Sequence, residues 1–169
     1  MRFCFLLILS ALAVTQSMAQ TPGSLYDPAQ SRKVGPGMEW LLGPKSVGTR
    51  YDQRMIRAAE IALKRAQKKT SWHCWRSVKD ALLAAEAIPT RPTTAWAKQA
   101  GDELCEKYGF MKLKLSDPYR APVGAVIVYG GPDAGHVELR TSSGFVSDFV
   151  SSSPYPRPLV GIYVKPIPG

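Results

Sequence analysis

The apolar pattern of this chain changes its period once, and that order limits the folds open to it. Apolar residues recur at helical spacing in three segments between residues 51 and 108, and the spacing then changes to the alternation of short strands. Helices that precede strands, instead of alternating with them, predict an α+β domain in which N-terminal helices pack on a small antiparallel sheet.

The three helical segments have recognisable faces and ends. We predict helices over residues 51–68, over 74–87 and from Thr93 or Thr94 to Tyr108, with Gly109 as the C-terminal stop of the third. The first two carry apolar faces at i, i+3 and i+4 spacing, made by Met55, Ala58, Ala59, Ala62 and Ala66 and by Val78, Ala81, Leu82 and Ala85.

Strands are expected over residues 111–115, 123–129, 136–140, 145–150 and 160–165. The third and fourth of these would pair as a hairpin across the four residues Thr141 to Gly144.

The N-terminus has the pattern of an export signal. Arg2 precedes an apolar run from Phe3 to Val14, and small residues at Ser17 and Ala19 suit cleavage after Ala19. The sequence therefore predicts a signal peptide at 1–19, a linker or extended arm rich in Pro, Gly and Ser at 20–49, and one domain at 50–169. An uncleaved membrane anchor is the alternative.

The net charge of +9 limits the kinds of binding partner that we expect. Loss of Arg2 with the signal leaves +8, and a basic protein that is secreted or periplasmic meets anionic envelope polymers or membrane surfaces instead of nucleic acid. The densest basic cluster, Lys64, Arg65, Lys68 and Lys69, also fits a solvated helix face.

Cys74 stands where the second predicted helix begins. A cysteine attacks only as the thiolate, and the unpaired N–H groups and positive dipole end at a helix start favour that anion. The backbone N–H of Cys74 could also stabilise an oxyanion. On these grounds Cys74 is the candidate nucleophile.

His136, at the start of the hairpin, is the candidate acid and base for Cys74. Asp148, on the predicted returning strand, is our favoured partner to orient the imidazole. The register is not determined by the sequence, and a four-residue loop would put Asp148 on the opposite face and present Glu138 and Ser147 instead.

Other residues near Cys74 suggest a substrate cleft. His73 is expected on its rim, and Trp75 and Trp96 are candidate substrate-binding residues, as is Glu138 if it does not orient His136. Each of these aromatic residues could instead belong to the core.

Two other roles for Cys74 compete with that of a catalytic nucleophile. Cys74 and Cys105 are the thiols left after signal cleavage, and an exported protein could join them as a disulfide. A zinc site is disfavoured because no Cys-x-x-Cys or His-x-x-x-His spacing occurs, and neither a metal nor another cofactor is expected.

The order of a cysteine-headed helix, a further helix, a strand and then Gly135-His136-Val137 resembles the papain-like bacterial amidases of the NlpC/P60 and CHAP type. The segment Gly124-Ala125-Val126-Ile127-Val128-Tyr129 resembles their strand before the histidine hairpin, and the similarity spans about residues 50–165. Around the nucleophile the sequence differs from the family's Asp-Cys-Ser/Ser-Gly-Phe type. Asp148 also differs from the family's usual third residue.

The resemblance implies a papain-like fold and hydrolysis of amide bonds in peptidoglycan. We therefore expect an exported cysteine amidase or endopeptidase with Cys74, His136 and Asp148 as its triad. The alternatives are a non-catalytic envelope-binding module with a Cys74–Cys105 bridge, and an acyltransferase that uses the same acyl-enzyme.

Overall fold

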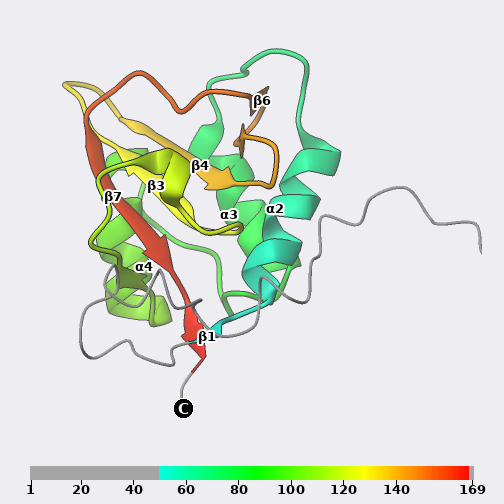
Figure 1. Cartoon of the computed structure of the whole chain (residues 1–169), viewed down its shortest axis with the longest axis vertical. Coiled ribbons are helices and arrows are strands. Elements are labelled where there is room, and N and C mark those ends of the chain that lie inside the picture. Colours follow the sequence, from blue (N-terminus) through cyan, green and yellow to red (C-terminus); the bar gives the residue numbers. More distant parts are fainter. Residues whose placement is uncertain (1–49, 168–169) are drawn as a thin grey trace, which may run out of the picture.

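In the computed structural model, which describes residues 50–167, the helices precede all strands of the main sheet along the chain (Figure 1). The helices are α2 (Arg54–Arg65), α3 (Cys74–Ala84) and α4 (Ala100–Tyr108), with 3₁₀ turns η2 (Ala97–Gln99) and η3 (Pro118–Arg120). The strands of the main sheet are β2 (Met111–Lys112), β3 (Val126–Tyr129), β4 (His136–Arg140), β5 (Phe145–Val146), β6 (Val150–Ser151) and β7 (Leu159–Val164). The predicted α+β class is confirmed.

The sheet is antiparallel throughout, with the strand order β2-β7-β3-β4-β5-β6. A separate two-stranded ribbon pairs β1 (Arg50–Tyr51) with β8 (Pro166–Ile167), so the two ends of the described chain lie side by side.

Both faces of the central strands are buried, which explains the continuous apolar run of β3. Val126 and Val128 face the core shared with α2, α3 and α4, whereas Ile127 and Tyr129 belong to a second apolar cluster on the opposite face. The predicted stripe of α3 is buried in the first core and packs this helix beside β4. This contact places the start of α3 near the strand that carries His136.

Helix boundaries differ from the prediction by a few residues. α2 is shorter at both ends, and α3 ends three residues early, where Glu86 takes a positive φ of 58°. The third predicted helix begins later, at η2 and α4, because Thr93 and Thr94 bind the Glu103 carboxylate instead of starting the helix. Its C-terminus is as predicted, since Gly109 takes the left-handed conformation and its N–H donates to the Leu104 carbonyl.

The predicted strand over residues 145–150 is wrong in one respect. β5 ends at Val146, and Ser147 to Phe149 form the turn into β6, which folds back on β5. The four-residue link between β4 and β5 is as predicted.

The signal peptide predicted at 1–19 and the arm at 20–49 lie outside the described residues. Within residues 50–167, no helix has the length and apolarity that crossing a membrane requires.

Candidate active site

Cys74 is the first residue of α3, as predicted. The first intrahelical bond runs from the Ser77 N–H to the His73 carbonyl (2.9 Å), so the N–H groups of the first turn remain directed out of the helix. Cys74 is half-buried and lies in the wall of a cleft of about 380 Å³. The nucleophile candidate is thus accessible, and it lies where the helix dipole favours an anion.

His136 begins β4 and lines the same cleft. The residue is 5% exposed, and the ring of Tyr155 stacks on the imidazole at 3.9 Å between centroids with an interplanar angle of 17°. The pairing of Tyr129 with His136 in the β3–β4 register fixes its backbone. The structure therefore brings together the two residues predicted to form the nucleophile pair.

Glu138 is the carboxylate beside His136. It lies two residues further along β4, hence on the same face, and its Oε2 is 3.5 Å from Nε2 of the imidazole. That distance is long for a hydrogen bond, so the contact is chiefly electrostatic. The Tyr129 hydroxyl donates to Oε1 of Glu138 (2.6 Å), and both side chains are buried. With Nε2 turned to Glu138, Nδ1 is the nitrogen available to Cys74.

The surroundings of His136 favour its protonated form. Burial lowers the pKa of His136, but its interactions with Cys74 and Glu138 outweigh it and raise the pKa to about 9. An imidazolium at neutral pH beside a sulfur is the arrangement expected of a thiolate–imidazolium pair.

Asp148 does not lie where the sequence analysis expected it. It sits in the turn between β5 and β6, and its Oδ2 accepts hydrogen bonds from the Ser71 N–H (2.5 Å), the Ser71 hydroxyl (2.9 Å) and the Thr70 hydroxyl (3.0 Å), with a longer contact to the His73 N–H (3.4 Å). The prediction placed it on an unbroken strand, and the turn at Ser147 to Phe149 removes that strand. The alternative carboxylate, Glu138, is the one that faces the imidazole.

The contacts of Asp148 hold the segment that leads into Cys74. Burial raises the pKa of Asp148, but the bonds from Ser71 and Thr70 outweigh it and hold the pKa below its usual value. Trp72, the next residue after Ser71, takes a positive φ of 63°, which is unfavourable for a residue with a side chain, and its N–H donates to the Thr70 hydroxyl (3.1 Å). Asp148 thus stabilises a strained loop immediately before the nucleophile.

The predicted substrate-binding residues have different positions. His73 is exposed and lines the cleft, as expected of a rim residue. Trp75 lines it too but is 3% exposed, so it serves mainly as wall and core. Trp96 is half exposed beside the cleft, and the Lys98 ammonium lies 4.7 Å from its ring centroid. Glu138 is buried beneath the imidazole, which removes it from the substrate surface.

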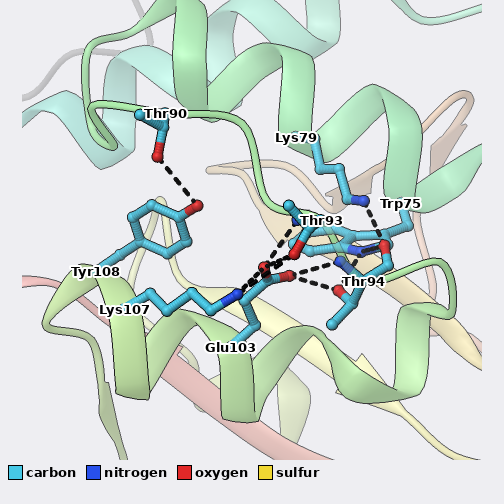
Figure 2. A network of polar contacts seen from close by, with 8 residues as sticks. All are labelled: Trp75, Lys79, Thr90, Thr93, Thr94, Glu103, Lys107 and Tyr108. Carbon is cyan, nitrogen blue, oxygen red and sulfur yellow. Dashed lines mark hydrogen bonds and ion pairs between the residues drawn. The ribbon is translucent and has the colours of Figure 1, made fainter.

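A polar network around Glu103 holds the wall that contains Trp75 (Figure 2). The Glu103 carboxylate accepts bonds from both the N–H and hydroxyl groups of Thr93 and Thr94, at 2.6 to 3.0 Å. Burial raises the pKa of Glu103, but these bonds outweigh it and lower the pKa to about 2. Thr94 in turn accepts a bond from the Trp75 indole N–H at its carbonyl (3.2 Å) and hydroxyl (3.1 Å). The network therefore connects α4 to the residue after Cys74.

Both cysteines of the described residues are free thiols. Cys105 lies on α4, and burial is the main reason that its pKa is raised. Among residues 50–167, no three His, Cys, Asp or Glu side chains gather as a metal site would require.

Comparisons with known proteins found a similar fold but no similar family model or curated sequence. No family model and no curated protein sequence matches the chain. Among solved structures, the chain is similar to a chain in "Crystal structure of the type VI native effector-immunity complex Tae3-Tai3 from Ralstonia pickettii". The identity is 24% and the TM-score is 0.54, over 66% of this chain and 97% of that one. The likeness shows that the two chains share a fold, an α+β arrangement of helices on an antiparallel sheet in this chain.

Some residues of the site carried no signal in the sequence. Tyr155 stacks on His136 from a Pro-rich loop, and the Asp133–Arg157 ion pair (2.5 Å) lies in the lining of the cleft. Neither loop has a period that predicts its path. The Tyr129–Glu138 bond could have been anticipated, because Tyr129 ends a strand that pairs with the histidine strand.

Proposed function

We propose that this protein is an exported cysteine amidase that hydrolyses amide bonds of peptidoglycan. The observation that carries the proposal is the pairing of Cys74 at the start of α3 with His136 in one cleft, with Glu138 behind the imidazole. An exported basic protein suits an anionic envelope substrate, and the resemblance to NlpC/P60 and CHAP amidases supplies the substrate class.

Each residue of the site has its own role in the proposed reaction. The Cys74 thiolate attacks the amide carbonyl carbon, and the first-turn N–H groups of α3, including that of Cys74, stabilise the oxyanion. The His136 imidazolium gives its proton to the leaving amine as the C–N bond breaks, which leaves a thioacyl-enzyme. Neutral His136 then takes a proton from water, whose oxygen attacks the thioester, and the C–S bond breaks to release the carboxylate and restore the thiolate–imidazolium pair.

Two carboxylates support this chemistry in different ways. Glu138 orients the imidazole and stabilises its charged form, whereas Asp148 holds the 70–73 loop that carries the nucleophile. We thus replace the predicted triad of Cys74, His136 and Asp148 by Cys74, His136 and Glu138, with Asp148 as a positioning residue.

The fold similarity bears on the biological role. A chain of a type VI effector–immunity complex shares this fold, and an immunity protein has no need of a cysteine–histidine pair. We therefore propose that our chain corresponds to the effector side, as a wall-degrading toxin that acts in the periplasm.

The test is a digest of purified peptidoglycan, with the soluble products identified by mass spectrometry. The wild-type protein and a Cys105→Ala control should release fragments with a new amine and a new carboxylate, and Cys74→Ala should release none. Equal release by Cys74→Ala, or products cut between the sugars, would contradict the proposal.

A further inference from the structure

A second hollow adjoins the cleft on the outer side of α3. Its volume is about 470 Å³, and its lining consists of Trp75, Arg76, Lys79, Asp80, Arg91 and Ala95. Trp75, Arg76 and Ala95 line the cleft as well. A bound molecule could therefore extend from Cys74 into this space, which we call the cationic hollow.

The charge of the cationic hollow is strongly unbalanced. Three of its residues, Arg76, Lys79 and Arg91, are cations, and Asp80 is its one carboxylate. Arg91 forms an ion pair with Asp80 (2.8 Å), and both side chains are about two-fifths exposed. Such an exposed pair is weak and can exchange partners at little cost. Two positive charges remain without a counterion in the lining.

Lys79 is the unusual member, because it is a cation that is only 6% exposed. Its ammonium donates to the Thr94 carbonyl and lies 4.9 Å from the ring centroid of Trp75 (Figure 2). Within residues 50–167 no carboxylate lies at ion-pair distance from it. Burial, followed by the charge of Arg91, lowers the pKa of Lys79. The hydrogen bond of the ammonium goes to a neutral carbonyl, and the charges of Glu103 and Asp80 only partly offset burial and Arg91, so the ammonium gains from an added anion.

We propose that the cationic hollow is a subsite for a free carboxylate of the peptide substrate. The proposal rests on the proposed function and specifies its substrate as an acidic peptide. Arg76 and Lys79 follow Cys74 by two and five residues on α3 and point about 200° and 140° away from it around the helix axis, so their separation from Cys74 exceeds the axial rise. The carboxylate that binds here therefore lies a few residues from the scissile amide.

This carboxylate could be the peptide's C-terminus or a free carboxylate within it. Either would receive a forked pair of bonds from an arginine, which a carboxamide cannot reproduce because it has one oxygen and no charge. Amidation of each position in turn separates the two sources.

The experiment measures binding by calorimetry, in the Cys74→Ala background so that nothing is cleaved. The probes are disaccharide-peptide fragments released from peptidoglycan by a muramidase: the parent, a form amidated at the C-terminus, and a form amidated at the internal carboxylate. We expect Arg91→Gln to weaken binding of the parent about tenfold. Arg57→Gln, on the exposed surface of α2, is the matched control and should leave binding unchanged.

Two further variants exclude simple damage to the hollow. Asp80→Asn removes the competing carboxylate and should tighten binding of the parent. The double variant Asp80→Asn with Arg91→Gln keeps the net charge of the starting protein and should bind the parent more weakly than Asp80→Asn alone. Arg91→Gln should leave the binding of one of the two amidated probes unchanged, and the position amidated in that probe identifies the carboxylate.

The subsite is overturned if both amidated probes bind as tightly as the parent, or if Arg91→Gln weakens all three equally. Cleavage of the same probes by the protein with Cys74 intact keeps the two proposals apart. If the parent and both amidated probes are cleaved equally well, the subsite proposal is overturned and the amidase proposal stands. If binding depends on a carboxylate but no cleavage depends on Cys74, the amidase proposal is overturned and the subsite proposal stands.

Discussion

Replacing Asp148 by Asn tests whether this carboxylate holds the loop before Cys74 or orients His136. The substitution keeps the size of the side chain but removes its charge and replaces one oxygen by an N–H donor. If the amide nitrogen takes the place of Oδ2, the Ser71 N–H loses its acceptor; if it takes the place of Oδ1, the Ser147 hydroxyl (3.1 Å) must reverse and accept, and the remaining bonds from Thr70 and Ser71 go to an uncharged oxygen.

The expected cost follows from these contacts. A hydrogen bond to a charged group contributes about 1.5–3 kcal/mol, so losing the charge at a buried site that accepts several should reduce the free energy of unfolding by about 2–4 kcal/mol. For a domain of this size that lowers Tm by roughly 10 °C, which still leaves a folded protein. Because the loop carries the nucleophile, kcat should fall, while the alkaline limb of the pH–rate profile stays in place.

Acid should affect the variant less than the wild type. The pKa of Asp148 is lower in the folded protein than its usual value, so its contribution to stability is present above about pH 4 and is lost as the pH falls through the folded pKa. Asp148→Asn should lack this part of the acid-induced loss of stability.

The assays are urea denaturation between pH 3 and 7 and kcat/KM against pH, with Asp102→Asn on the exposed start of α4 as control. The account is refuted if Asp148→Asn is as stable as the control and its alkaline limb moves to lower pH. Asp148 would then act on the imidazole, as the sequence first suggested.

Three other substitutions give separate tests. Glu138→Gln should lower the pKa of His136 from about 9 and move the alkaline limb of kcat/KM with it, because the imidazolium loses its carboxylate; NMR titration of the ring follows this directly. Glu103→Gln should reduce stability by about 2 kcal/mol in thermal melts, since its buried carboxylate accepts four bonds from Thr93 and Thr94 and a fifth from Lys107. Gly124→Ala should cost at least about 2 kcal/mol, because φ is +89° and a Cβ would come within 2.7 Å of the α2 backbone; Gly130→Ala, where the nearest atom is 3.3 Å away, is its control and should cost far less.

The sequence predicted the elements well because most of them depend on burial. The α3 stripe and the both-face burial of β3 follow from apolar spacing, and Gly109 ends α4 because it reaches a positive φ without strain. Helix starts were less predictable. Thr93 and Thr94 look like caps, but a tertiary contact with Glu103 uses their donors.

The residues of the candidate site were likewise predictable only in part. Cys74 and His136 could be found because each begins an element whose position follows from local pattern. The partner of the imidazole could not be settled, because it depends on whether the strand after Phe145 continues. The chain turns at Ser147 to Phe149, and one irregular turn sends Asp148 to the 70–73 loop and leaves Glu138 beside His136.

The most direct test of the central claim is the alkylation rate of each thiol across pH under non-reducing conditions, with the modified residue identified by mass spectrometry. We predict that Cys74 labels at least about tenfold faster than Cys105 at neutral pH, because it lines the open cleft together with His136, whereas burial raises the pKa of Cys105. His136→Ala should slow Cys74 and leave Cys105 unchanged. Failure of both thiols to label until a reductant is added would mean a Cys74–Cys105 disulfide and would contradict the enzyme account.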